Sequence, residues 1–274
     1  MITTDGFRDV LEIGRTRRML PSVYDPTFVR PAPLVPRPLR FEVAERVDKD
    51  GSVLIPLDHA AIKELAPILD RLGIEALAIC FLHAYAHPEH EQRTVDILRH
   101  AVPDIAITAS HQVVPEFREY ERFSTTVINA YLAPIMSRYI GALTADPQVR
   151  KGRLTIMQSN GGTILASSPQ LEPVRTLLSG PAGGVLGAFR MTRLAGYDKT
   201  ITLDMGGTST DVCLCDDGVA TSNEALIDHL PVPVQTIPIH SIGAGGGSIA
   251  WVDSGGLLRV VPRSAGADPG PLCY

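Results

Sequence analysis

The residues with the clearest chemistry lie in one short segment, Leu203-Asp-Met-Gly-Gly-Thr-Ser-Thr-Asp211. Strand-forming residues lead into it, and the paired glycines predict a tight turn that returns the chain as a second strand. Because glycine has no Cβ, the turn amides can approach an anion closely, and hydroxyl side chains add further donors. The predicted phosphate contacts are Gly206, Gly207, Thr208, Ser209 and Thr210.

Aspartates stand on both sides of this turn. Asp204 ends the first strand, where a carboxylate can hold Mg²⁺ or its waters and so offset phosphate charge. Asp211 is either a second catalytic carboxylate or a brace of the hairpin, and bracing is the favoured role. A lone Gly-Gly-Thr is as often a plain turn as a phosphate site. The two aspartates therefore make phosphate binding the favoured interpretation of this cluster.

Three other glycine clusters lie elsewhere in the chain. Met157–Gly162 ends a predicted strand, and Gly243–Ser248 is a glycine-rich loop. Ser179–Gly184 opens a predicted helix that ends near Gly196. Its start either binds an anion at the helix N-terminus or is capped by the serine ahead of proline, and the two alternatives are equal. Further nucleotide contacts are expected at Gly180, Gly183, Gly245, Gly246 and Gly247.

Other motifs for nucleotide or nucleophilic chemistry do not match. The chain has no Gly-Lys dipeptide, which excludes a Walker-type phosphate loop. Ser248 stands where a dinucleotide fingerprint starting at Gly243 would need its third glycine. The Gly-x-Ser-x-Gly elbow of many hydrolases is missing from the sequence.

Histidine and cysteine clusters are weaker signals. His83, His87 and His90 could hold zinc, but a polar loop leaving a strand explains them more simply. Cys213 and Cys215 alternate along a strand and share one face, which favours small buried residues over a metal or redox pair. The four cysteines form no CxxC pair and fit a reducing cytoplasm.

The composition argues against several classes of protein. The 274 residues carry a net charge of −5, which argues against nucleic acid as a partner. An apolar content of 45% with 20% charged residues is typical of a globular chain. The apolar run Ala76–Leu82 is far too short to span a membrane, so no membrane partner is expected.

The first half of the chain alternates strand and helix. Strands at 76–82 and 105–108 follow helices at 58–73 and 89–101, and this order predicts a parallel α/β sheet. Pro67 should kink the first of these helices or move its start.

Further along, a long helix at 123–143 should be interrupted near Pro134. Thr4 is expected to cap a short helix near the beginning of the chain. The composition changes after residue 150, because 19 of the 24 glycines lie in that part of the chain. A domain boundary is expected near residue 120.

Together these segments resemble the hydantoinase A/5-oxoprolinase family, which includes ATP-dependent hydantoinases, 5-oxoprolinase and subunits of acetone-type carboxylases. The matching stretches keep the family's order and span nearly the whole chain. They are Gly6–Gly14, Pro115–Arg122, Ser124–Tyr131, Met157–Gly162, Leu178–Gly184, Asp204–Val212, Ile242–Ser248 and Ser264–Pro271.

The resemblance implies an α/β protein with an incomplete actin-like ATPase (ribonuclease H-like) fold, in which mixed sheets carry flanking helices. Residues 1–120 would be the C-terminal part of the family's N-terminal region, and 121–274 the N-terminal part of its core domain. The implied cofactors are ATP and Mg²⁺, and the implied reaction is ATP-driven hydrolysis of a hydantoin or 5-oxoproline through a phosphorylated carbonyl. Asp204 and the hairpin donors would position phosphates and metal.

The sequence departs from the family pattern in one respect, and this departure leaves alternative functions open. Family members begin with another Asp-x-Gly-Gly-Thr hairpin and continue beyond the segment that ends here, so a truncated subunit is expected. It could instead be an inactive remnant that keeps the nucleotide-binding scaffold, or a subunit of an ATP-dependent ketone carboxylase. The resemblance implies a B-type subunit as partner, and exposed sheet edges predict association with a second copy.

Overall fold

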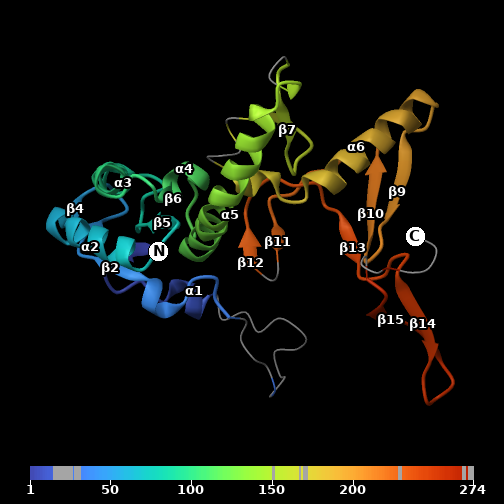
Figure 1. Ribbon diagram of the computed structural model, residues 1–274, viewed down its shortest axis with the longest axis horizontal. Helices are drawn as coiled ribbons and strands as arrows, with labels where there is room; N and C mark the ends of the chain where they lie inside the picture. Colours follow the sequence, from blue (N-terminus) through green and yellow to red (C-terminus); the bar gives the residue numbers. More distant parts are fainter. Residues whose placement is uncertain are drawn as a thin grey trace. The chain divides into compact units, whose positions relative to one another are not determined.

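Figure 1 shows the computed structural model of the chain, which describes residues 1–14, 27, 32–149, 152–166, 168, 172–227, 230–266 and 270. The chain divides into two compact units. Unit 1 comprises Met1–Ile156, Ile164–Arg175 and Glu224–Val234, and unit 2 comprises Met157–Thr163, Thr176–Asn223 and Gln235–Tyr274. Cys273 and the end of the Ser264–Pro271 stretch lie outside the described residues.

Unit 1 is built on a four-stranded parallel sheet of strand order β2-β1-β5-β6. The connection from β2 to β5 contains helix α2 (His59–Arg71), and helix α3 (Glu89–Ala101) connects β5 to β6. Parallel neighbours require such crossovers, so the expected alternation of strand and helix is confirmed. The strands are β1 (Ile2–Thr4), β2 (Phe41–Val43), β5 (Ala76–Cys80) and β6 (Ala106–Ala109).

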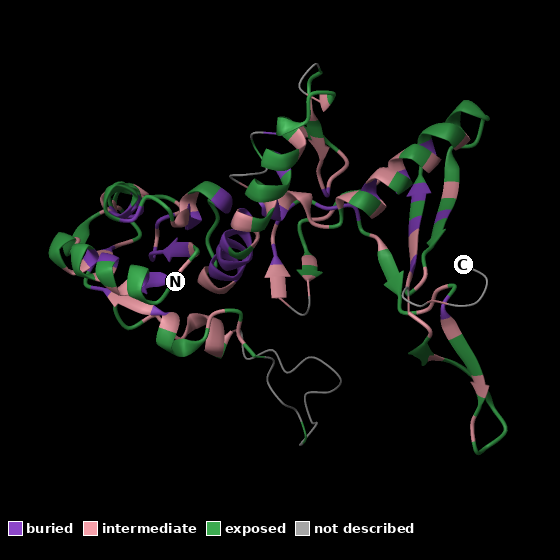
Figure 2. Ribbon diagram, viewed as in Figure 1, coloured by how far each residue is buried: buried purple, intermediate pink, exposed green. Residues whose placement is uncertain are grey.

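Both faces of this sheet are covered by helices. Along β5 and its exit, Leu77, Ile79 and Phe81 face a core shared with α2 and α3. Cys80 and Leu82 face the opposite core, shared with helix α5 (Glu119–Ala145). This period of two places alternate side chains in separate cores. Figure 2 shows β5 and much of α5 as buried.

Two helices of unit 1 run through a proline. Helix α2 contains Pro67, and its first residue follows Asp58, whose carboxylate accepts hydrogen bonds from the backbone of Ala60 and Ala61. Helix α5 contains Pro134 and continues to residue 145, so the expected interruption is wrong. A proline removes one helical hydrogen bond, and tertiary packing of the buried helix face offsets that loss.

Thr4 ends strand β1 and caps no helix, which corrects the sequence expectation. Its buried hydroxyl donates to the carboxylate of Glu45 and accepts a hydrogen bond from the Leu82 N–H at 3.1 Å. The short helix α1 (Val10–Ile13) begins after Asp9, without a side-chain capping bond. Sheet pairing of the fully buried β1 therefore overrides the local capping signal.

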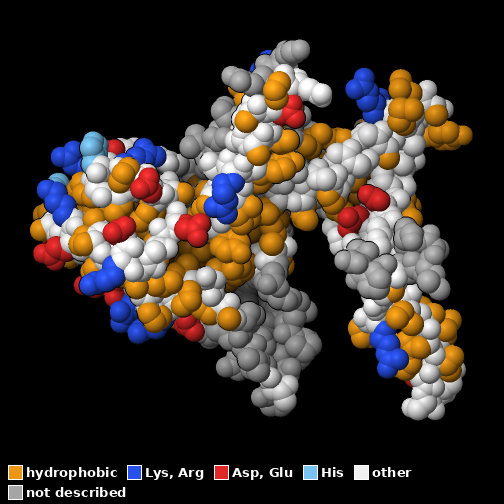
Figure 3. Space-filling view, in the orientation of Figure 1, with side chains coloured by type: hydrophobic (Ala, Val, Ile, Leu, Met, Phe, Trp, Pro, Cys, Tyr) orange, Lys and Arg blue, Asp and Glu red, His pale blue; other side chains and the backbone are white. Residues whose placement is uncertain are grey.

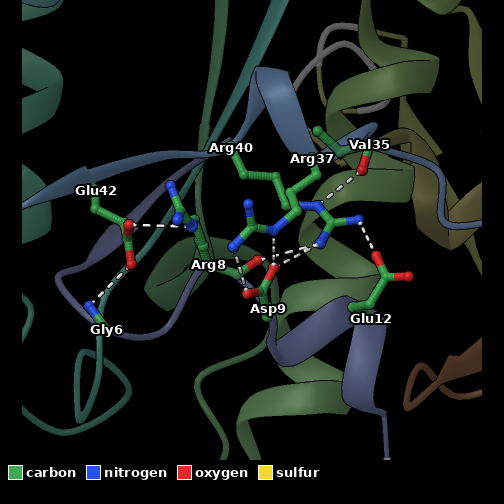
Figure 4. A network of polar contacts seen from close by, with 8 residues as sticks. All are labelled: Gly6, Arg8, Asp9, Glu12, Val35, Arg37, Arg40 and Glu42. Atoms are coloured by element: carbon green, nitrogen blue, oxygen red, sulfur yellow. Dashed lines mark hydrogen bonds and ion pairs between the residues drawn. The ribbon is translucent and has the colours of Figure 1, made fainter.

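A network of ion pairs ties α1 to the 3-10 turn η1 (Arg37–Leu39), as Figure 4 shows. The side chain of Arg40 is fully buried. Its Nη2 donates to Glu12 at 2.9 Å and its Nε to the carbonyl of Val35 at 2.9 Å. Arg37 donates to Asp9 at 3.0 Å, and this hydrogen bond lowers the pKa of the Asp9 carboxyl. The position of α1 is therefore fixed from one side by two arginines.

The elements of unit 1 not yet described, and those at its chain boundaries with unit 2, are short. Helix α4 (Ser110–Val113) follows β6 directly. The part of the chain with defined placement has no helix of the length and apolarity needed to cross a membrane. The short antiparallel strand pairs are β3 (Arg46–Val47) with β4 (Val53–Ile55), β7 (Thr155–Met157) with β8 (Thr163–Leu165), and β11 (Ala225–Ile227) with β12 (Leu230–Val232); η3 (Pro173–Thr176) is a 3-10 turn.

Unit 2 contains a three-stranded antiparallel sheet of order β13-β10-β9. Strands β9 (Lys199–Met205) and β10 (Thr210–Asp216) pair over their full length, and β13 (His240–Ile242) pairs with β10. Helix α6 (Ser179–Leu194) packs on this sheet. Cys213 and Cys215 lie in the core between them, which confirms their interpretation as buried residues, and burial raises the pKa of the Cys213 thiol.

A second hairpin of unit 2 pairs β14 (Ser248–Val252) with β15 (Leu258–Ser264). Its turn is held by Asp253, whose carboxylate accepts from the N–H of Leu257 at 3.0 Å and from Arg259 at 2.8 Å. These contacts lower the pKa of the Asp253 carboxyl. Hydrophobic side chains gather on the surface of this hairpin (Figure 3), where Leu258 is 71% exposed.

Candidate functional site

The predicted glycine turn is the tip of the β9–β10 hairpin. The Gly206 N–H donates to the carbonyl of Ser209 at 2.9 Å and closes the turn. Among the described residues, no acceptor pairs with the N–H groups of Gly207, Thr208 or Ser209. Successive backbone donors in a turn form a concavity suited to an anion. The tip therefore has the donors that a phosphate group requires.

A glycine-rich loop packs directly on this tip. The Gly246 N–H donates to the carbonyl of Gly206 at 2.9 Å, and the Gly247 N–H donates to that of Gly207 at 2.7 Å. A Cβ on Gly245 would lie 2.5 Å from the Gly206 oxygen, closer than real Cβ atoms approach. The loop thus supports the tip through its backbone, and the amides of Gly246 and Gly247 are already used in that contact.

Two hydroxyl groups hold the loop in place. Thr210, which is buried, donates to the carbonyl of Ala244 at 2.6 Å. Ser248 accepts from the N–H of Gly245 at 2.9 Å. The Thr210 hydroxyl therefore donates within the protein, and the hydroxyls of Thr208 and Ser209 are those that stand at the tip.

The two aspartates face each other across the hairpin. Asp204 on β9 is directly opposite Asp211 on β10. Asp211 accepts a short hydrogen bond from the Ser241 hydroxyl on β13, which is the contact expected of a brace. Like charges opposite each other on paired strands destabilise a sheet, and a divalent cation beside them would relieve the repulsion.

The donor set at the hairpin fits Mg²⁺. Magnesium is usually held by one or two carboxylates and completes its octahedral shell with waters and phosphate oxygens. Asp204 is exposed at the end of β9, close to the turn donors. A cage of three or more His, Cys, Asp or Glu side chains is found nowhere in the described ranges. An ion at Asp204 would therefore depend on phosphate and water for its other ligands.

Helix α6 starts near the same carboxylate. A Cβ on Gly184, in its second turn, would lie 3.9 Å from Oδ2 of Asp204. Leu178 precedes the helix with φ +59° and makes no capping bond, so Ser179 is the first helical residue and not the cap. Asp204 therefore lies beside the second turn of α6, beyond the first turn in which the helix dipole acts most strongly.

The other predicted site residues differ in whether they have close neighbours. Gly183 lies against Met157, because a Cβ added at Gly183 would be 3.8 Å from the Cε of Met157. A Cβ added at Gly180 would meet no atom within 4 Å. Gly184 and Ser241 were missed as site residues. Gly184 had a signal, because it belongs to the Ser179–Gly184 cluster. Ser241 had none, because it reaches Asp211 only through sheet pairing 30 residues away.

His87 in the loop after β5 and His90 on α3 make separate contacts in unit 1. His90 Nδ1 lies 2.8 Å from a carboxylate oxygen of Glu45. His87 Nε2 lies 3.2 Å from the carbonyl oxygen of Lys49. These contacts correspond to the polar-loop interpretation of the cluster.

The fold and the site define a mixed α/β protein with several sheets and a glycine-turn hairpin. Comparison with known families agrees along most of the chain. The Hydantoinase/oxoprolinase family model matches residues 122–274, and the model of the Hydantoinase/oxoprolinase N-terminal region matches residues 1–102. The chain belongs to the hydantoinase/oxoprolinase family.

Three relatives illustrate this membership. The caprolactamase subunit alpha of Pseudomonas jessenii is 39% identical over the whole chain. The crystal structure of the ATP-dependent caprolactamase from that organism matches all of the chain with a TM-score of 0.82 and 38% identity, and 40% of it is covered. The nucleotide-free acetone carboxylase structure matches 97% of the chain with a TM-score of 0.78 and 31% identity, and 39% of it is covered.

The third relative, 5-oxoprolinase 1 of Arabidopsis thaliana, is 33% identical over the whole chain, which spans 23% of that protein. The chain spans about 40% of the length of the bacterial caprolactamase subunit.

Proposed function

We propose that this chain is the nucleotide-handling part of an ATP-dependent enzyme that opens a cyclic amide. ATP phosphates bind the turn amides of Gly207, Thr208 and Ser209, and Mg²⁺ binds beside Asp204. The observation that carries the proposal is the row of unpaired donors next to a pair of opposed carboxylates. Family membership and the ATP-dependent caprolactamase relative support it.

The chemistry requires activation of a poor electrophile. In this reaction the ring carbonyl oxygen would accept the γ-phosphoryl group of ATP, with ADP as the leaving group. Water would then attack the activated carbon, the C–N bond would break, and phosphate and a ring-opened amino acid would be released. Phosphoryl transfer is catalysed mainly by positioning and charge stabilisation. In this proposal the turn amides of Gly207, Thr208 and Ser209 would hold the phosphates, and Asp204 would hold a Mg²⁺ ion that offsets their charge.

The remaining site residues have supporting roles in this proposal. Asp211 fixes the hairpin through Ser241, and Gly245 allows the glycine loop to approach the tip. Gly180 and Gly183 keep the start of α6 open for a phosphate group near Asp204. The antiparallel β9–β10–β13 sheet with α6 packed on it is the part of an actin-like ATPase fold that we assign to unit 2.

A ketone carboxylase subunit is the second candidate. The similarity to the acetone carboxylase structure covers 97% of the chain, and activation of a ketone enolate would use the same phosphate site. Because relatives of both kinds are named as subunits, we propose a B-type subunit as partner. The buried cysteines of the described chain, which form no disulfide, suit a cytoplasmic enzyme.

Calorimetry with MgATP tests the proposal. The chain should bind MgATP, and Asp204→Asn should weaken binding at least about tenfold because a metal ligand is lost. Asp216→Asn is the matched control, since Asp216 is exposed at the other end of β10 and pairs with Lys199. Equal binding by the two variants would remove Asp204 from the site, and no binding by the wild type would identify an inactive remnant.

A further inference from the structure

Polar side chains gather at the carboxyl edge of the parallel sheet in unit 1, where the proposed function has no role for them. Thr4 ends β1, Glu45 follows β2, and His83 follows β5. Ser110 and His111 come directly after β6. In open α/β sheets, ligands bind outside the carboxyl ends of the strands. This edge is therefore the place in unit 1 where a ligand is expected.

Glu91 on α3 organises this edge and is fully buried. One carboxylate oxygen accepts from the Phe81 N–H at 2.8 Å and from the Ser110 hydroxyl at 2.6 Å. The other accepts from the His111 N–H at 3.0 Å and lies 2.7 Å from its Nδ1. The acceptor capacity of this carboxylate is committed to these partners.

Arg122 on α5 is the unsatisfied member of the cluster. Its side chain is fully buried, its Nη1 donates to the Ser110 hydroxyl at 2.5 Å, and the same nitrogen lies 4.0 Å from Glu91. No described residue accepts a hydrogen bond from its Nε or Nη2. Burying unpaired donors of a charged group is costly, so these two nitrogens call for an acceptor.

The two unpaired nitrogens have a defined geometry. Nε and Nη2 lie on the same edge of the planar guanidinium and form a fork that matches the two oxygens of a carboxylate. The rings of Phe123 and Tyr85 lie 5.3 and 5.9 Å from the guanidinium carbon. These flat apolar neighbours suit a small planar group.

A cavity of about 400 Å³ opens at the exit of β5. Leu82 and His83 line it from the exit of β5, with Tyr120 from α5 and Val10 from α1. The Nδ1 of His83 is buried and has no partner in the described part of the chain. The ring of His83 lies 6.3 Å from that of Tyr85, which Arg122 also contacts. The rings of His83 and Tyr85 thus connect the cavity wall to the Arg122 guanidinium.

We propose that unit 1 binds a small carboxylate, whose two oxygens accept hydrogen bonds from Nε and Nη2 of Arg122. The charge of the site favours a monoanion, because Glu91 already lies 4.0 Å from the guanidinium. A phosphate dianion would leave excess negative charge in a buried place. The ligand enters through the cavity and passes His83.

Calorimetric titration of the full chain with acetate at constant ionic strength tests this site. Saturable binding is expected, and Arg122→Lys should weaken it at least about tenfold, since lysine keeps the charge but lacks the fork. Arg138→Lys on the same helix should bind as the wild type does, because Arg138 is exposed and pairs with Glu75. Inorganic phosphate should bind more weakly than acetate.

The proposal is overturned if the wild type shows no saturable acetate binding, if Arg122→Lys binds equally well, or if phosphate binds as tightly as acetate. Should Arg122→Lys fail to fold, Ser110→Ala replaces it. This variant keeps the fork but releases Nη1, so acetate affinity should fall several-fold, and an unchanged affinity places acetate elsewhere. No nucleotide is present in these titrations, so their outcome is independent of the MgATP experiment.

Discussion

At the scale of single residues, Asp204 and Asp211 set two like charges opposite each other beside the turn of the β9–β10 hairpin. Such a pair costs about 0.2–1 kcal/mol relative to a neutral pair. The charge of Asp204 lowers the stability of the sheet, and Asp204 lies beside unpaired backbone N–H groups that can bind phosphate. This combination is typical of a residue that serves binding and not stability. Its neighbour Asp211 differs, because Ser241 donates to it.

This difference gives a prediction for stability. Asp204→Asn removes the repulsion, so the free energy of unfolding should stay unchanged or rise by up to about 1 kcal/mol, while MgATP binding falls. Urea denaturation measures the first quantity on the protein used for calorimetry. A loss of more than about 1 kcal/mol would show that Asp204 has a structural role and that its effect on binding is indirect.

At the scale of residues, the hairpin could be predicted because its features are local in the sequence. The pairing of glycines, hydroxyls and aspartates from Asp204 to Asp211 is a local pattern, and the structure has the predicted strand, turn and strand there. The fork of Arg122 could not be predicted, because its partner Ser110 and its neighbour Glu91 lie on different elements. Thr4 was misread for the same reason: its contacts with Glu45 and Leu82 are long-range.

At the scale of elements, the contact between the glycine loop and the hairpin tip determines the shape of the site. Two backbone hydrogen bonds join them, from Gly246 to Gly206 and from Gly247 to Gly207. Sequence analysis located both the loop and the hairpin. Sequence analysis could not show that the loop contacts the hairpin tip, because this contact depends on the pairing of β13 with β10.

Gly245→Ala should destabilise unit 2 by about 1–3 kcal/mol, since the new Cβ would lie 2.5 Å from the Gly206 carbonyl oxygen. Gly243→Ala is the matched control in the same loop, where a Cβ would meet no atom within 4 Å. Urea unfolding of both variants gives the comparison. Equal stabilities would mean that the loop does not press on the hairpin tip.

At the scale of the whole molecule, the described surface carries apolar side chains that globular proteins normally cover. On β9, Ile201, Leu203 and Met205 alternate on one face and are 68%, 67% and 58% exposed. Leu214 on β10 is 68% exposed. Large apolar patches of this kind mark interaction surfaces, and β9 is an edge strand of its sheet, which favours pairing with a second copy.

The chain should therefore self-associate in light scattering at raised concentration. Substituting Leu203→Ser and Leu214→Ser together should shift it toward monomer, because the apolar face is interrupted on both strands. Leu194→Ser, at a leucine at the end of α6 that is even more exposed, is the control and should leave association unchanged. A monodisperse wild-type monomer would contradict this expectation.

The central claim is that the β9–β10 tip binds the phosphates of ATP. The most direct test is a titration of the ¹⁵N-labelled chain with MgATP, followed through its backbone amide signals. Saturable shifts of the Gly207, Thr208 and Ser209 amides are predicted, because their N–H groups donate to phosphate oxygens. MgATP-induced shifts confined to other residues, or no shifts at all, would contradict the account.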